Sequence, residues 1–180
     1  MCIHTSYNLS FYPYRKVQNI PLAEGDIVKE KYLYAFKSPK SKQWYWVWVE
    51  AYDFDMYTVK FHLKSDRNSP TKYNRLTGFN EARAVINTCI AIMLEVNELN
   101  PNSSFGFVGA NLPNESEKET KRFKVYKRIM VTYFPLSVFD HRENKEKSAY
   151  MLVRRTELEK HPDLIQKIED FFSDNFTYFD

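Results

Sequence analysis

The chain has 180 residues, with 26 Lys and Arg against 23 Asp and Glu, and a formal net charge of +3. This length suits one domain with a real core, so we expect a single globular domain over residues 1–180. Only two cysteines are present, which excludes a dense disulfide framework. No apolar run approaches the roughly 18 residues of a membrane helix, so we predict a soluble, cytoplasmic protein that has no contact with a membrane.

Charge is distributed unevenly along the chain. Residues 1–156 hold 24 Lys and Arg against 16 Asp and Glu, whereas the last 24 residues hold 2 against 7. We therefore expect a basic body and an acidic C-terminal helical segment over residues 157–180. A basic body is compatible with binding to a polyanion.

The first half of the chain has the two-residue periodicity of β-strands. Residues 43–51 predict a central strand, since both of their faces are apolar, and residues 57–64 predict a strand with one apolar and one basic face. Residues 28–38 predict a third strand. Residues 6–14 predict an edge strand, because Pro13 cannot donate a hydrogen bond to a neighbour.

Helical periodicity begins after the turn-rich residues 65–78. Apolar residues recur at spacings of three and four from Phe79 to Leu99, and Thr77 is the expected N-cap. Ser116 and Glu119 have the spacing of a capping box, which predicts a second helix that ends near residue 134.

The remaining segments complete the predicted order of elements. Residues 103–110 predict a short strand, 136–142 and 148–155 a hairpin, and residues from His161 onward a final helix. The order is β-β-β-β-α-β-α-β-β-α. It predicts an α+β fold with a mainly antiparallel sheet and with helices packed on one face.

Two of the four glycines, Gly106 and Gly109, lie just before the basic second helix. Their spacing fits neither a phosphate-binding loop nor a dinucleotide-binding motif. We expect Gly106 to mark the close approach of a neighbouring backbone or ring, and Gly109 to end the strand.

Arg122 lies on the apolar arc of the second predicted helix, where an unpaired guanidinium would be costly. The structural interpretation is a tie from Arg122 to the carbonyls of residues 109–111 or to Asp140. The functional alternative is a polar notch that receives a phosphate, a carboxylate or a base edge. The notch would consist of Asn111, Arg122 and Tyr126.

This part of the chain also carries a resemblance. Residues 105–111 read F-x-F-x-G-A-N, and Arg122 and Tyr126 form an R-x-x-x-Y pattern in the helix that follows. The arrangement resembles small uncharacterised α+β proteins in which such a strand end precedes an R-x-x-x-Y helix. The resemblance implies that Arg122 and Tyr126 act as a unit, and it implies no activity.

Trp44, Trp46 and Trp48 share one face of the central strand. They could form a platform on which bases stack. The preferred interpretation is that they belong to the core and pack under the long helix, because the opposite face of the strand is apolar too.

Basic side chains suggest a binding surface, although charged surfaces are commonly just solvated. The leading hypothesis is a non-enzymatic protein that binds RNA or single-stranded nucleic acid. The alternative is an inhibitor or interaction protein that docks on a nucleoprotein or other nucleic-acid-handling enzyme. The candidate residues are Lys60, His62, Lys64, Arg67, Lys72, Lys121, Lys124, Lys127 and Arg128.

Catalytic and metal-binding patterns give little support to an enzyme. The four histidines are scattered and no Cys or His pair has ligand spacing, so neither a metal nor a cofactor is expected. A metal-independent ribonuclease or toxin stays open as a second alternative. It would use His62 or His141 with Lys60 and a tyrosine as general acid and base.

Overall fold

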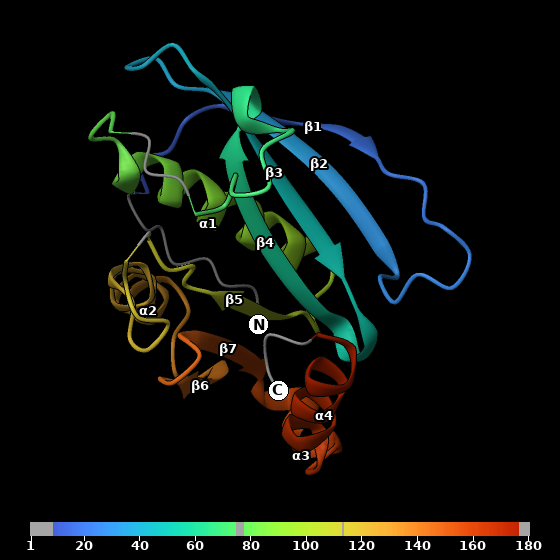
Figure 1. Cartoon of the computed structure of the whole chain (residues 1–180). Helices are drawn as coiled ribbons and strands as arrows, with labels where there is room; N and C mark the ends of the chain where they lie inside the picture. Colours follow the sequence, from blue (N-terminus) through green and yellow to red (C-terminus); the bar gives the residue numbers. More distant parts are fainter. Residues whose placement is uncertain (1–8, 75–77, 113, 177–180) are drawn as a thin grey trace.

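A computed structural model describes residues 9–74, 78–112 and 114–176 of the chain. A seven-stranded sheet forms its centre, in the order β1-β2-β3-β4-β5-β7-β6 (Figure 1). All neighbouring strands are antiparallel except β4 and β5, which are parallel. This confirms the α+β class and the mainly antiparallel sheet. The strands are β1 (Tyr14–Asn19), β2 (Glu30–Lys37), β3 (Trp44–Ala51), β4 (Met56–Leu63), β5 (Ser104–Val108), β6 (Phe139–Asn144) and β7 (Ala149–Arg154).

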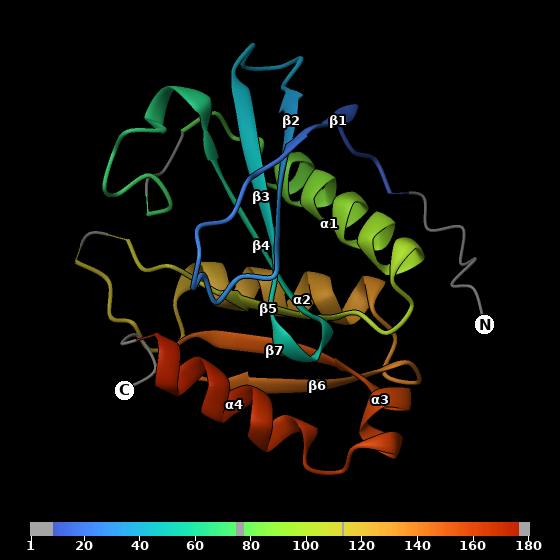
Figure 2. The same cartoon turned by 90° about the vertical axis from the view of Figure 1, so that its right-hand side faces the viewer.

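Four helices lie on the two sides of the sheet: α1 (Ala82–Leu99), α2 (Lys121–Tyr133), α3 (Arg155–Lys160) and α4 (Leu164–Asn175). Figure 2 shows α1 and α4 on opposite sides. The expectation that the helices share one face therefore holds for α1 and α2 but not for α4. Within the described residues, none of these helices combines the length and the apolar character needed to cross a bilayer.

The main core lies between the sheet and the helices α1 and α2. The strands contribute alternate residues to it, such as Val47 and Val49 of β3 and Tyr57 of β4, because successive side chains point to opposite faces. A second, smaller core on the other face joins Met56 and Val153 to α4. The sheet is thus covered fully on one face and only at one end on the other.

The first predicted strand is displaced in the structure. The edge strand β1 begins at Tyr14 and not at residue 6, since residues 9–13 are irregular and residues 6–8 lie outside the described part. The strand at this edge of the sheet is β1, which pairs with β2 and shares only Tyr14 with the segment predicted as the edge strand. Pro13 precedes the strand and so removes no ladder hydrogen bond.

Both predicted helix starts are also displaced. The N-cap of α1 is Glu81, and Thr77 lies outside the described residues. The capping box from Ser116 to Glu119 is wrong, because the N-cap of α2 is Thr120, whose hydroxyl accepts a hydrogen bond from the Phe123 amide. Thr120 can do so because its side chain is held between the strand end and the helix.

The placement of the Trp row, the side chains of Trp44, Trp46 and Trp48, was predicted wrongly. Tyr45, Val47 and Val49 face α1, so the three tryptophans point to the other side of the sheet. Trp44 is 38% exposed, and Trp46 and Trp48 are half-buried. The strand register gives the physical reason: Trp46 lies opposite His62 and Trp48 opposite Lys60, on the polar face of β4.

Candidate nucleic-acid interface

The Trp row lies on the face of β3 that is turned away from α1, since Val47 and Val49 of the same strand face the main core. Its neighbours on β2 are compact: Ala35 pairs with Trp46 and Leu33 with Trp48. The rings of Trp46 and Trp48 meet edge to face at 6.1 Å between centroids. The result is a row of indoles along one strand of the uncovered part of the sheet.

Each indole of the Trp row lies beside a cation. The guanidinium of Arg15 is 5.8 Å from the Trp44 ring, and the ammonium groups of Lys64 and Lys31 are 5.6 and 5.4 Å from Trp46 and Trp48. Such contacts are weakly favourable at exposed sites. They also place positive charge along a row of aromatic rings, which is the combination found in surfaces that bind single strands.

His62 is buried between Trp48 and the backbone. The indole Nε1 of Trp48 donates to His62 Nε2 at 3.0 Å, and His62 Nδ1 lies 2.7 Å from the Leu63 carbonyl oxygen. Because the indole nitrogen can only donate, this pair requires a neutral imidazole that is protonated on Nδ1. Burial lowers the pKa of His62. His62 therefore orients Trp48 and does not serve as a surface cation.

Glu50 is a buried carboxylate at the lower end of the Trp row. It binds Lys31 at 2.9 Å and Lys60 at 2.6 Å, and it accepts a hydrogen bond from the Tyr52 hydroxyl at 2.8 Å. Burial alone would raise the pKa of Glu50, but the two lysines and Tyr52 lower it to about 2. Glu50 thus stays charged and fixes both lysines at the edge of the tryptophans.

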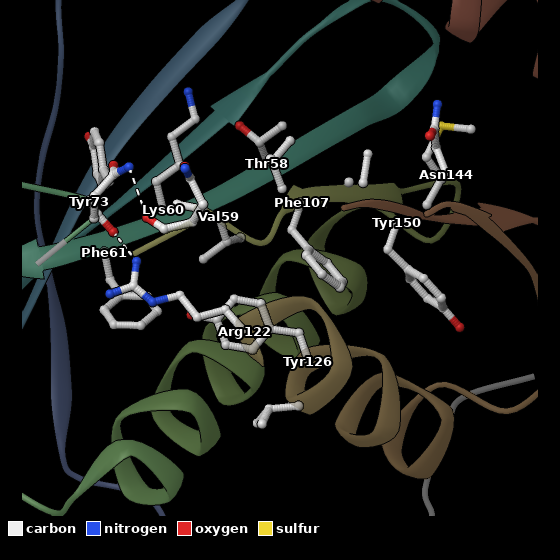
Figure 3. Close-up of a pocket in the computed structure, with 18 of the residues that line it drawn as sticks. Thr58, Val59, Lys60, Phe61, Tyr73, Phe107, Arg122, Tyr126, Asn144 and Tyr150 are labelled. Carbon is white, nitrogen blue, oxygen red and sulfur yellow. Dashed lines mark hydrogen bonds between the residues drawn. The ribbon is translucent and has the colours of Figure 1, made fainter. Parts of the chain in front are cut away.

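The sheet opens between its two parallel strands. β4 and β5 pair only from Met56–Ser104 to Thr58–Gly106, although β4 continues to Leu63. A cavity of about 1230 Å³ extends from this gap, where β4, β5, α2 and the loop around Tyr73 border it (Figure 3), to β6, β7 and α4. The cavity adjoins the Trp row, because Lys60 and His62 belong to both.

The predicted polar notch lies in this cavity, which is lined by Asn111, Arg122 and Tyr126. Arg122 Nη1 donates to the Tyr73 carbonyl oxygen at 2.5 Å. The structural tie expected of Arg122 thus goes to the Tyr73 loop and not to residues 109–111. Asn74 reinforces this loop by donating to the Asn111 carbonyl oxygen at 3.2 Å.

The other partner expected for Arg122 was Asp140. Its carboxylate binds two different arginines, Arg142 at 2.6 Å and Arg155 at 3.3 Å. Both arginines lie on or next to the β6–β7 hairpin, at the far edge of the sheet. Asp140 therefore belongs to a surface charge cluster and not to the cavity.

The strand end at Gly109 sets the position of α2 over the cavity. A Cβ at Gly109 would lie 2.5 Å from the Phe123 amide nitrogen, so only glycine permits this approach. The Thr120 hydroxyl donates to the Gly109 carbonyl oxygen at 2.6 Å and closes the junction. The expected close approach thus occurs at Gly109, whereas the nearest contact of Gly106 would be the flexible end of Met56.

The structure divides the predicted basic residues into three groups. Lys60, His62, Lys72 and Lys121 line the cavity, together with the notch residues. Lys64 lies at the Trp row, and Arg67 is exposed on the turn after β4. On α2, Lys124 and Arg128 are exposed, and Lys127 pairs with Glu143 of β6.

Sequence reasoning left Arg15 and Lys31 out of the candidate surface, and it placed the tryptophans inside. The alternation in β4 did contain a usable signal. Its polar face and the Trp face of β3 lie on the same side of the sheet, because the two strands are neighbours in register. Only the register, Trp48 opposite Lys60, connects the two faces. Register depends on the hairpin between the strands, and the patterns of the separate strands do not specify it.

The second histidine weighed for catalysis is His141. Its Nδ1 lies 2.8 Å from the Tyr150 hydroxyl and its Nε2 lies 2.8 Å from the Phe134 carbonyl oxygen. Both ring nitrogens of His62 and of His141 thus have protein partners, which gives a ribonuclease mechanism little support. Among the described residues, no group of three or more His, Cys, Asp or Glu side chains could hold a metal ion.

Comparison with other proteins assigns this chain to no family. No family model matches the sequence, and searches of curated proteins and of solved structures also give no match. Fold and site define an α+β protein with an aromatic, cation-lined sheet face and a cavity beside it.

Proposed function

We propose that this protein binds single-stranded nucleic acid, either RNA or single-stranded DNA, along the Trp row. The observation that carries the proposal is that each of three indoles on an uncovered sheet face lies within 5.8 Å of a Lys or Arg charge centre. Bases stack on aromatic rings irrespective of sequence, for about 1 to 3 kcal/mol each, and the cations attract the phosphates between them.

The charge around the Trp row supports the same ligand. Four cations surround the three rings, and Glu50 is the carboxylate that touches two of them. Since Glu50 is buried, its charge is directed at Lys31 and Lys60 and not at the surface of the indoles. The cations are Arg15, Lys31, Lys60 and Lys64.

The experiment that tests the proposal is a titration of the tryptophan fluorescence with short oligonucleotides. Oligouridylate and oligothymidylate are expected to quench the emission, because the bases stack on the Trp row. The apparent affinity should fall with salt, with a slope of roughly −0.7 per neutralised phosphate on a double-logarithmic plot. Blunt duplex DNA of equal charge should quench little, since its bases are already stacked. Equal quenching by duplex and single strand would contradict the proposal.

A second function, docking on a nucleic-acid-handling enzyme, is favoured by the outer side of α2. Val125, Val131 and Leu136 are 47 to 57% exposed there, next to Lys124 and Arg128. Apolar side chains among charges are common at protein interfaces. The variant Lys124→Glu with Arg128→Glu separates the two functions, because it should leave oligonucleotide affinity unchanged if the Trp row is the ligand site.

A further inference from the structure

The cavity between β4, β5 and α2 lies beside the Trp row and has a different shape and lining. It arises because the pairing of two parallel strands stops after Thr58 and Gly106, while α2 and the Tyr73 loop close the sides. Its volume of about 1230 Å³ is sufficient for a nucleotide-sized ligand. The Trp row and the cavity thus adjoin at Lys60.

The walls of the cavity are aromatic on several sides. Phe61 comes from β4, Tyr73 from the loop, Phe107 from β5 and Tyr126 from α2 (Figure 3). Phe107 and Tyr126 meet edge to face at 5.3 Å, and Phe107 stacks with Tyr150 at 5.4 Å. Rings that come from four separate elements offer a planar ligand both faces and edges for contact.

Cations lie where the aromatic walls end. Lys60, Lys72, Lys121 and Arg122 line the cavity, and the Lys72 ammonium is 5.3 Å from the Tyr73 ring. Arg122 also holds the Tyr73 carbonyl, so the loop wall and the charge are coupled through one side chain. A ligand that combines a planar ring with an anionic group fits this lining best.

The Tyr126 hydroxyl adds a polar contact inside the cavity. Burial raises the pKa of Tyr126 to about 12, so the hydroxyl is protonated at neutral pH and can both donate and accept. The edge of a base offers the complementary donors and acceptors.

From these contacts we propose that the cavity receives one base of the bound strand, turned out of the row that stacks on the tryptophans, with its phosphate next to Arg122. This inference rests on the proposed function, because the base belongs to the strand held by the Trp row. The base would lie against Phe107 and Tyr126, whose rings meet edge to face in this wall of the cavity. The site is therefore a specificity pocket beside a sequence-tolerant platform.

The test combines abasic oligonucleotides with cavity variants. Fluorescence anisotropy measures the affinity of strands of about ten nucleotides, each with one abasic position, for wild-type protein and for Tyr126→Leu. In wild-type protein, loss of the base at one position should weaken binding about tenfold, and in Tyr126→Leu the same loss should have no effect. Val131→Leu, at an exposed position of α2 outside the cavity lining, is the matched control and should behave as wild type. Thermal melting of each variant confirms that it is folded.

The outcomes separate the inference from the proposed function. If the strand binds but no abasic position depends on Tyr126, the cavity inference is overturned and the Trp row remains. The variant Tyr126→Phe isolates the effect of the hydroxyl, because it keeps the ring and removes only that group. It should change the preference among the four bases without changing the affinity for an abasic strand. If no single strand binds at all, the proposed function and the inference both fail.

Discussion

The indole nitrogen of Trp48 donates a hydrogen bond to Nε2 of His62, 3.0 Å away on the neighbouring strand. This bond joins the row of tryptophans to the strand that also forms the wall of the cavity. It exists only while the imidazole is neutral, because a protonated Nε2 has no lone pair to accept with. The orientation of Trp48 is thus connected to pH.

We predict that the protein loses stability as the pH falls below about 6.5. Burial lowers the pKa of His62 in the folded state, so the unfolded chain binds a proton at a higher pH than the folded chain does. The contribution of His62 to the free energy of unfolding is therefore complete above the pKa of the unfolded chain. It is lost as the pH falls through the lower pKa of the folded protein. Thermal midpoints measured between pH 8 and pH 5 check the direction.

The pKa of His141 is shifted in the same direction, since burial lowers it too. Two variants, His62→Gln and His141→Gln, should each remove part of the pH dependence. His161→Gln, at an exposed histidine, is the control for the effect of the substitution itself. A wild-type midpoint that rises between pH 6.5 and pH 5 would show that the histidines gain and do not lose favourable contacts on protonation.

Gly109→Ala should destabilise the protein by about 1 to 3 kcal/mol, because a Cβ there would overlap the backbone of Phe123. The α2 helix would have to move away from the strand, which also shifts Arg122 and Tyr126. Urea unfolding measures the loss. Gly106→Ala is the matched control, since its Cβ would meet the flexible end of Met56 at 3.2 Å and the Tyr150 carbonyl oxygen at an ordinary 3.9 Å. Equal midpoints for the two variants would mean that α2 does not depend on this approach.

Glu81→Gln should cost about 2 kcal/mol or more of unfolding free energy, the value of hydrogen bonds to a charged group. The buried carboxylate of Glu81 accepts from the hydroxyls of Ser38, Ser41 and Tyr45 and so ties the start of α1 to the β2–β3 hairpin. Burial would raise the pKa of Glu81, and these hydroxyls lower it below its ordinary value. Glu98→Gln, exposed on the same helix, should change the urea midpoint little.

Much of the fold follows from periodicity along the chain. The alternation from Tyr57 to Leu63 and the helical spacing within α1 are strong signals, because each places a continuous apolar face on one side of an element. The face of the Trp row was misjudged for a physical reason: β3 is apolar on both sides, so its own pattern holds no information on which side α1 covers. The start of α2 was misplaced for another reason: Thr120, its N-cap, also donates to the Gly109 carbonyl oxygen, a contact that the local sequence pattern does not contain.

Part of the candidate site was predictable as well. The cavity does bring together Asn111, Arg122 and Tyr126, as the notch interpretation expected. The Tyr73 carbonyl as partner of Arg122 was not predictable, since the loop comes from 49 residues away and its position depends on where β4 separates from β5. The binding role of these residues stays a prediction.

Arg122→Lys should loosen the Tyr73 loop and lower the thermal midpoint by a few degrees, because an ammonium does not reproduce the planar fork of the guanidinium. Hydrogen exchange at the amides of residues 72–74 should become faster. Lys124→Arg on the exposed side of α2 is the control and should change neither quantity. Unchanged exchange in Arg122→Lys would show that the loop is held by other contacts.

The affinity of Trp44→Ala for a short single-stranded oligonucleotide tests the central claim most directly. Trp44 is 38% exposed, so its loss should leave the urea midpoint nearly unchanged while weakening binding by about fivefold or more, the value of one stacked base. Leu136→Ala, which removes an apolar side chain that is 57% exposed beyond α2, should bind as wild type does. Wild-type affinity in Trp44→Ala, or an equal loss in Leu136→Ala, would contradict the assignment of the Trp row as a nucleic-acid platform.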